Sequence, residues 1–410
     1  MEIRPILSAL LRSRTAPLLV AAQVAISLAV LANALYMVDL RLSASMRPSG
    51  TTDETTVFTA RSRPLAKMSA AEILAKQRRE VETLRAIPGV VAVAYTSQMP
   101  FSTSGNNSNL MLDPKQTRPA ANASVYSSPD SLVTALDLKL VEGRDFNASD
   151  VVEVDFETDN NRNAESVIIT QALARKLFPE SASAIGKTFQ QGSGSNPTLR
   201  VVGVVERLIT PFANTGERGD YSIILPVRFL GAGSLYAVRT APGQRDSVSK
   251  QAEQALRKAA GGPTLTRIRT LDGDRDMRYR DARAMAWMLV AVSALLMLVT
   301  ASGVVGMTTL RVAQRRKQIG VRRALGGRRI DILRYFMTEN AMITGTGVAV
   351  GCVLALALNH LLVTRLEMSK LPPAFLLYGA VVFLVLGSAS VLGPLLKAAR
   401  ISPSLATRSA

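Results

Sequence analysis

The stretch AMAWMLVAVSALLMLVTASGVVGMTTL, residues 284–310, decides the fold class of this 410-residue chain. It contains no charged side chain. A helix of this length, rising about 1.5 Å per residue, is long enough to cross a hydrocarbon core of about 30 Å. A buried helix of a water-soluble protein would instead carry charges along one face at intervals of about 3.6 residues. We therefore predict a transmembrane helix here.

Three further windows have the same apolar character: residues 17–38, 341–363 and 371–396. The first window has an alternative interpretation as a secretory signal, because arginines precede it and Ala32-Asn33-Ala34 resembles a cleavage site. It is longer than the apolar region of a signal peptide, which has about 7 to 15 residues, so an uncleaved anchor is favoured. The chain is predicted to have four transmembrane helices.

Positive charge gathers beside these windows. The chain has 49 Lys and Arg against 31 Asp and Glu, a net charge of +18. Residues 1–16 carry +2, residues 311–334 carry +8 and residues 397–410 carry +3, whereas the long segment 39–283 carries only +5. Because basic segments stay on the cytoplasmic side, we predict cytoplasmic residues 1–16, 311–340 and 397–410, and outer segments 39–283 and 364–370. This distribution explains the basic composition without a nucleic-acid partner.

Segment 39–283 is too long for a connecting loop and has strand and helix signals of its own. Residues 57–60 and 90–96 are rich in strand-forming residues, and the capping box Ser69-Ala70-Ala71-Glu72 begins a helix between them. Near the far end, residues 221–227, 235–239 and 264–271 are predicted as strands and residues 246–260 as a helix. We expect an α+β domain in which these two β–α–β units are halves of one fold.

Catalytic and metal-binding chemistry finds no support in the sequence. One cysteine, Cys352, and one histidine, His360, exclude an intramolecular disulfide and any multi-cysteine or multi-histidine metal site. The string Ser181–Thr188 resembles a phosphate-binding loop but has Ser181 where that motif requires glycine. We expect no catalytic residue and no metal in this chain.

The segment RVAQRRKQIGVRRALGGRRIDILRYFMTE, residues 311–339, alternates basic residues with apolar ones. Ile319, Val321, Ala324 and Leu325 precede Gly326-Gly327, after which the apolar pattern resumes. Such a pattern is typical of a short amphipathic helix at a membrane surface. A charged loop that only sets the topology is the alternative.

This segment closely resembles the coupling element of FtsX/MacB-type ABC permeases. The strings LKLVEGRDF at 138–146, VIITQALARKLFPESASAIGK at 167–187 and VVGVV at 201–205 also resemble outer-domain motifs of that family. The tail at 401–406 is similar as well, although Ser402 and Leu405 depart from the family pattern.

The resemblance implies a membrane α-helical protein with four transmembrane helices and a large α+β periplasmic domain. That domain would comprise a porter-like part at 55–135 and 220–271, an inserted β-rich part at 136–219 and a stalk at 272–283. The coupling contact with an ATPase would be made by the following residues: Ile319, Gly320, Arg322, Arg323, Ala324, Leu325 and Gly326.

The resemblance also implies a function. The chain would be the permease subunit of an ATP-driven mechanotransmission transporter of the bacterial inner membrane, which moves an antibiotic, peptide or similar substrate in the periplasm. Only 16 residues precede the first window and no Walker sequence is present, so we expect the ATPase, with its ATP and Mg²⁺, on a separate chain. Two alternatives stay open: an FtsX-like subunit that signals to a cell-wall hydrolase, and a lipoprotein-releasing permease.

Further partners are implied by the same resemblance. They are a second copy of the chain or a similar permease and, in tripartite systems, a periplasmic membrane-fusion adaptor with an outer-membrane TolC-like channel. The residues alone distinguish neither a homodimer from a heterodimer nor one cargo from another.

Small residues four apart on one helix face allow close packing of membrane helices. Three such sets occur: Ala21, Ala25 and Ala29; Ser302 and Gly306; Gly347 and Gly351. Because the family places its dimer contact on the first two helices, we expect the first two sets to face a second copy, and contacts within one chain are the alternative. In the charged run DGDRDMRYRDAR at 272–283, Arg275 and Tyr279 are expected on a solvated stalk.

Overall fold

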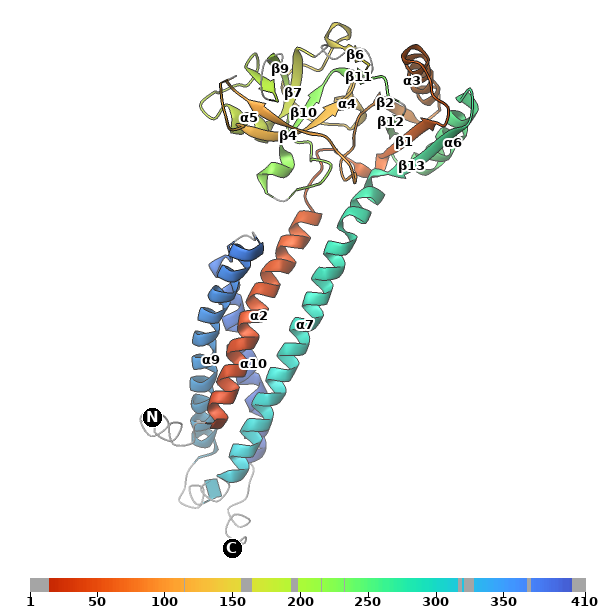
Figure 1. The fold of residues 1–410 in the computed structure, drawn as a ribbon. Helices are drawn as coiled ribbons and strands as arrows, with labels where there is room; N and C mark the ends of the chain where they lie inside the picture. Colours follow the sequence, from red (N-terminus) through yellow and green to blue (C-terminus); the bar gives the residue numbers. More distant parts are fainter. Residues whose placement is uncertain are drawn as a thin grey trace. The chain divides into compact units, whose positions relative to one another are not determined.

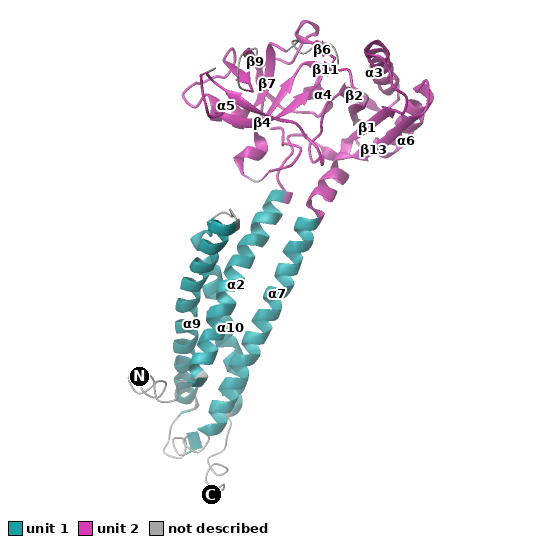
Figure 2. Ribbon diagram, viewed as in Figure 1, with its two compact units in different colours: residues 1–44, 281–410 teal, residues 45–280 magenta. Residues whose placement is uncertain are grey.

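The structure is a computed structural model that describes residues 15–113, 115–155, 164–192, 198–214, 216–231, 233–315, 319–320, 328–366 and 370–399. The chain divides into two compact units (Figure 2). We call residues 1–44 and 281–410 the membrane unit and residues 45–280 the α+β unit.

The membrane unit is built from helices that are long and apolar enough to cross a membrane. They are α2 (Thr15–Ser45), α7 (Leu271–Gln314), α9 (Arg329–Leu366) and α10 (Pro373–Ala399), of which α7 continues into the α+β unit (Figure 1). The prediction of four transmembrane helices is confirmed.

The core of the membrane unit draws on all four helices. Leu28 of α2, Val304 of α7, Phe336 of α9 and Phe383 of α10 belong to one buried cluster. Because the helices carry almost no charge in their middle, their surfaces can face either one another or lipid.

The α+β unit contains a four-stranded antiparallel sheet. Its strands are β1 (Val57–Pro64), β2 (Val90–Tyr95), β12 (Ser234–Thr240) and β13 (Thr264–Thr270), in the order β13-β1-β12-β2. The pairing of Phe58 with Val238 and Thr270, and of Tyr95 with Tyr236, sets the register. The two β–α–β units recognised in the sequence therefore share one sheet.

Two helices cover one face of this sheet. They are α3 (Ala70–Arg85) and α6 (Arg245–Ala259). The Ser69 hydroxyl accepts the Glu72 amide and the Glu72 carboxylate accepts the Ser69 amide, which is the capping box expected at the start of α3. Leu84 of α3 and Leu256 of α6 pack on Phe58 and Tyr236 of the sheet.

A second sheet has seven strands. They are β3 (Asn107–Met111), β4 (Ala121–Ser127), β5 (Leu140–Gly143), β7 (Ser166–Thr170), β8 (Thr188–Gln191), β9 (Thr198–Val205) and β10 (Ser222–Leu225). Their order is β5-β9-β7-β10-β4-β3-β8, and β8 also pairs with β9. This last pairing closes six of the strands into a ring.

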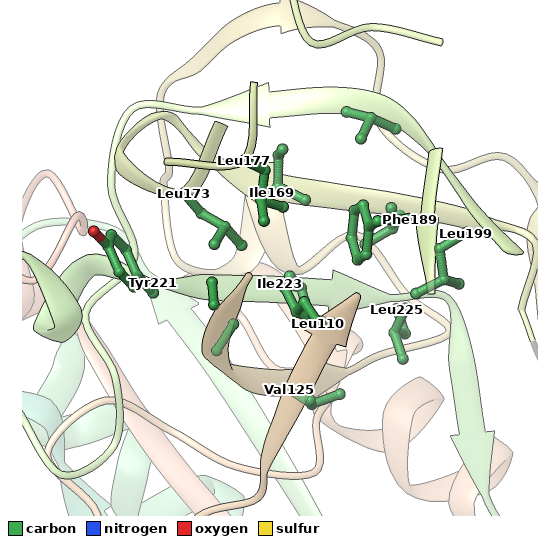
Figure 3. Close-up of a cluster of buried hydrophobic side chains, with 14 of the residues drawn as sticks. Leu110, Val125, Ile169, Leu173, Leu177, Phe189, Leu199, Tyr221, Ile223 and Leu225 are labelled. Atoms are coloured by element: carbon green, nitrogen blue, oxygen red, sulfur yellow. The ribbon is translucent and has the colours of Figure 1, made fainter. Parts of the chain in front are cut away.

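The interior of the ring is apolar. Phe189 and Leu199, from β8 and β9, point toward Leu110 and Val125 of β3 and β4 (Figure 3). Helix α5 (Gln171–Leu177) adds apolar side chains to the same cluster. The remaining elements are short: η1 (Glu54–Thr56), α4 (Leu132–Ala135), η2 (Ala148–Asp150), β6 (Val152–Val154), η3 (Glu217–Asp220) and β11 (Val227–Phe229).

The predicted boundary of the inserted part, 136–219, is wrong at both ends. Strands β3 and β4, expected in the porter-like part, pair in the seven-stranded sheet, and so does β10. The reason is that β4 pairs in parallel with β10, with Val125 opposite Ile223. Nothing in the local sequence of a short strand states which distant strand it will pair with.

Candidate coupling site

A buried ion-pair cluster joins the ends of α7 and α9 that flank the predicted coupling element. The Glu339 side chain is only 4% exposed, and its two oxygens accept from Arg311 at 2.8 Å and from Arg315 at 3.4 Å. Arg315 also donates to the Tyr335 hydroxyl at 3.1 Å. We call Arg311, Arg315, Tyr335 and Glu339 the inner clamp.

Arg311 and Arg315 lie where α7 ends, at Gln314, and Tyr335 and Glu339 lie in the first turns of α9, which begins at Arg329. The inner clamp therefore joins the two ends of the predicted coupling element. Sequence reasoning missed it, although Glu339 is the acidic residue nearest the third apolar window. An ionised carboxylate at the edge of a membrane helix is energetically costly unless it is paired with a cation. The presence of Glu339 in the sequence is therefore a signal that a basic partner lies nearby.

The coupling element itself is described only in part. Ile319 and Gly320 are helical and buried, and Ile319 packs in the core of the membrane unit with Val20 and Ile332. Ile319 therefore packs inside the membrane unit, and its contact with an ATPase stays a prediction. The predicted residues Arg322, Arg323, Ala324, Leu325 and Gly326 lie outside the described residues.

The alanine set of α2 packs inside the chain. A Cβ placed on Gly347 would come 2.8 Å from the Ala21 carbonyl oxygen, and one on Gly351 would come 3.0 Å from Cα of Ala25. Ala25 is 1% exposed, and Ala29 packs against Ala355 in a second small cluster. The expected dimer contact of Ala21, Ala25 and Ala29 is thus corrected to a seam between α2 and α9.

Helix α7 presents a different surface. Ser302 and Gly306 are exposed, and a Cβ on Gly306 would meet nothing within 4 Å in the described part of the chain. Leu295, Leu298 and Val299 on the same helix are each more than half exposed. Of the two sets expected to face a second copy, the one on α7 is available for that contact.

Polar side chains within the membrane unit bond to neighbouring helices. Ser27 of α2 hydrogen-bonds Thr300 of α7 at 2.9 Å, and the Asn33 amide donates to the Ala355 carbonyl at 3.1 Å. The Asn340 amide similarly donates to the Gly387 carbonyl at 3.1 Å. These groups are used in packing the helices.

The first turns of α7 are packed into the α+β unit. Arg275 donates to both carboxylate oxygens of Glu54 and to the carbonyls of Ser45 and Arg47, and its guanidinium lies 4.4 Å from the ring centre of Phe101. Tyr279, 6% exposed, meets the same ring edge to face. We call Arg275, Glu54 and Phe101 the outer clasp.

The outer clasp corrects the description of Arg275 and Tyr279 as solvated stalk residues. The charged run DGDRDMRYRDAR indicated solvent, but a guanidinium that reaches a carboxylate, two carbonyls and a ring can be buried at little cost. That set of partners comes from three separate segments, so the local sequence could not reveal it.

A second buried network lies under α3. Lys76 and Glu80 form an ion pair at 2.8 Å, and both bond the Ser62 hydroxyl. The Tyr236 hydroxyl donates to Glu80 at 2.6 Å, and burial followed by the adjacent Glu80 charge raises the pKa of Tyr236 well above its ordinary value. The Lys76 ammonium is ion-paired with Glu80, so it is not available as a base that would activate the Ser62 hydroxyl as a nucleophile. The network is therefore structural.

A polar cavity of about 800 Å³ opens at one end of the strand ring. Lys176 of α5 and Arg218 of η3 line it together with Asn122, Ser124 and Tyr221. Figure 3 shows the Tyr221 hydroxyl directed away from the apolar cluster. The lining offers cations, the Glu217 carboxylate, amides and hydroxyls to a polar molecule.

Known proteins match both parts of the chain. Residues 20–255 match the MacB-like periplasmic core domain, and residues 290–403 match the FtsX-like permease C-terminal domain. A heavy metal efflux pump of known structure is 12% identical in sequence, and the match covers 85% of this chain and 35% of that one with a TM-score of 0.18.

Among named relatives, the pyoverdine export ATP-binding/permease protein PvdT of Pseudomonas savastanoi pv. phaseolicola is 30% identical over 270 residues, which are 62% of this chain and 39% of that protein. The macrolide export ATP-binding/permease protein MacB of Agrobacterium fabrum is 28% identical over 257 residues, 60% of this chain and 37% of that protein. The chain thus aligns with less than two fifths of either relative.

The first domain match alone covers more than half of the chain, and the second takes in most of the helices that follow. The resemblance stated from the sequence is confirmed. This chain belongs to the family of MacB-like and FtsX-like ABC transporter permeases, and it is an integral protein of the inner membrane.

Proposed function

We propose that this permease couples ATP hydrolysis by a separate ATPase chain to movement of substrate by its α+β unit. The observation that carries the proposal is the inner clamp, which ties the two borders of the coupling element to each other through one buried carboxylate. A displacement of that element would therefore move α7 and α9 together.

Helix α7 supports the same proposal. It runs without a break from Gln314 to Leu271, 44 residues or about 66 Å, and contains no proline. It therefore contributes side chains both to the inner clamp and to the outer clasp. An unbroken helix transmits displacement along its axis better than a jointed one.

The proposed orientation places the coupling element and both termini in the cytoplasm and the α+β unit outside. Its support is the +8 charge of residues 311–334 against +5 for the whole of residues 39–283. ATP and Mg²⁺ would be bound by the ATPase, since only that partner is expected to have the nucleotide site.

The substrate would be handled in the periplasm. A polar conduit through the bundle would need free polar groups, because each unsatisfied one costs several kcal/mol in hydrocarbon. Ser27, the Asn33 amide nitrogen and Asn340 are instead engaged between helices. The relatives named for pyoverdine and macrolide export, together with the polar cavity of the α+β unit, favour efflux of an antibiotic, peptide or similar cargo. A membrane-fusion adaptor and a TolC-like channel would complete the export path.

Replacing Leu325 with Asp is expected to remove the ATPase from the purified permease. A charge buried without a partner at that contact would cost at least about 2 kcal/mol, or roughly 30-fold in affinity. The ATPase that copurifies with the tagged wild-type chain is identified by mass spectrometry and then quantified in the variant. Gln314→Asp, at an exposed position outside the predicted contact residues 319–326, is the control.

Wild-type recovery of the ATPase with Leu325→Asp would overturn the proposed contact. Loss with Leu325→Asp alone would also support the orientation, because a cytoplasmic ATPase reaches only cytoplasmic segments. With four crossings, both termini would then lie on the same side as the coupling element.

A second copy is proposed to pack on the exposed face of α7. In a Cys352→Ser background, Ser302→Cys is expected to form a disulfide-linked dimer when membranes are oxidised, whereas Ala25→Cys is not, because Ala25 packs on Gly351. Non-reducing electrophoresis reads the result. Efficient cross-linking at Ala25 and none at Ser302 would place the contact on α2 instead.

A further inference from the structure

The four-stranded sheet has an outer edge at β13. In the order β13-β1-β12-β2, strand β13 has β1 on one side, and within the described residues no strand pairs with its other side. The backbone of an edge strand can accept a further strand. Helices α3 and α6 occupy one face of the sheet, where Phe58, Ala60 and Tyr236 are buried beneath them.

The opposite face of β1 and β13 is rich in arginine. Arg61 lies directly opposite Arg267, Arg63 lies opposite Leu265, and Thr59 lies opposite Arg269. Arg61, Arg63, Leu265 and Arg267 are all exposed, and Leu265 is 59% exposed. We call these four residues the arginine face.

The arginine face lacks counter-charges. Asp274 forms an ion pair with Arg269 and lies within electrostatic range of Arg61 and Arg267, so one carboxylate serves three arginines. Among the described residues, Arg61, Arg63 and Arg267 have no carboxylate within ion-pair distance. Like charges directly opposite each other on neighbouring strands destabilise a sheet, and an acidic partner would reverse that effect.

Charged residues also protect sheet edges from aggregation, which is the simpler explanation. Two observations oppose it. Arg61 and Arg63 belong to β1, an interior strand of the sheet that needs no protection. The edge strand itself exposes Leu265, an apolar side chain that would favour association and not prevent it.

We propose that β13 and the arginine face together dock an extended acidic segment of a partner protein, which adds to the sheet as a fifth strand. Backbone hydrogen bonds along β13 would supply affinity. Asp or Glu at alternate positions would lie next to Arg267 and on the same face of the sheet as Arg61 and Arg63. The proposal rests on the proposed function only for the compartment, since the partner would be a protein on the same side of the membrane as the α+β unit.

The test uses the full-length protein in phosphatidylcholine nanodiscs and a fluorescein-labelled peptide, acetyl-TETETETET-amide. Fluorescence anisotropy is expected to show saturable binding, and the lysine counterpart TKTKTKTKT is expected not to bind. Methylating alternate backbone amides of the acidic peptide keeps its charge but prevents strand addition, so binding should fall at least tenfold.

The double variant Arg61→Glu/Arg267→Glu should weaken binding at least tenfold, and Arg61→Gln/Arg267→Gln should weaken it without reversing the charge. The matched control is Arg79→Glu/Arg175→Glu, on exposed arginines of α3 and α5, which should bind as wild type. Thermal unfolding checks that every variant is folded. Copurification of the ATPase should not change, which separates failure of this proposal from failure of the proposed function.

Three outcomes would overturn the proposal. Equal binding by the methylated peptide would exclude strand addition. Absence of peptide binding, with arginine-dependent binding to vesicles containing phosphatidylglycerol, would assign the face to anionic lipid. Loss of the dimer in Arg61→Glu/Arg267→Glu, measured by mass photometry, would assign it to a second copy.

Discussion

Replacing Glu339 with Gln is expected to lower the free energy of unfolding by about 3 to 5 kcal/mol, because Arg311 and Arg315 would remain near the core without a counter-charge. For a unit of this size, that loss corresponds to a fall of roughly 6 °C or more in Tm. Thermal unfolding of the purified protein in detergent, followed by helicity, measures the change. ATP-driven transport should be lost together with stability.

Two controls sharpen this expectation. Asp331→Asn removes an exposed carboxylate from the first turn of the same helix, where it accepts the Arg328 amide, and should lower Tm much less than Glu339→Gln does. Arg311→Met/Glu339→Met removes both buried partners and should be more stable than Glu339→Gln, because the buried carboxylate and its closest cation are removed together. A Tm for Glu339→Gln equal to wild type would show that the inner clamp does not hold α7 to α9.

Replacing Arg275 with Ala is expected to destabilise the α+β unit by about 3 kcal/mol. Glu54, whose side chain is 16% exposed, would lose a two-oxygen ion pair, and the carbonyls of Ser45 and Arg47 would lose their shared donor. Hydrogen–deuterium exchange should increase in residues 45–56 and around Phe101. The thermal transition of the unit should move to lower temperature.

Arg275→Lys tests the geometry of the outer clasp. A lysine keeps the charge but cannot present the planar fork that reaches Glu54, two carbonyls and the Phe101 face together, so a loss of more than about 1 kcal/mol is expected. Arg280→Ala, at an exposed position of the same helix, is the matched control. Unchanged exchange in both Arg275 variants would show that segment 45–56 is held by other contacts.

The features that the sequence could predict are those written in local patterns. Window 284–310 lies inside α7 because length and lack of charge suffice to define a membrane helix. The start of α3 was equally predictable, because the partners in a capping box, Ser69 and Glu72, lie three residues apart. The coupling residues Arg322 to Gly326 stay a prediction.

The errors concern residues whose partners lie far away in the chain. Spacing showed that Ala21, Ala25 and Ala29 share a helix face, but small residues of this kind suit a contact within the chain as well as one between chains. Strand β10 was assigned to the wrong sheet because its partner β4 lies about a hundred residues earlier. Arg275 was expected in solvent because the local sequence does not show that Glu54, more than two hundred residues earlier, pairs with it in the fold.

The join between β2 and β12 has a consequence for how such a protein can change over evolution. These neighbouring strands pair Tyr95 with Tyr236, and the Thr96 amide bonds the Leu235 carbonyl at 2.8 Å. Residues 97–233, which include the whole strand ring, are thus inserted between two paired strands, β2 and β12. A tight turn could connect the same two strand ends. An inserted segment whose two ends lie side by side can be enlarged, exchanged or deleted, because the strands of the four-stranded sheet keep all their pairing partners. The strand ring is therefore the segment that can change most freely over evolution while the four-stranded sheet keeps its strand pairing.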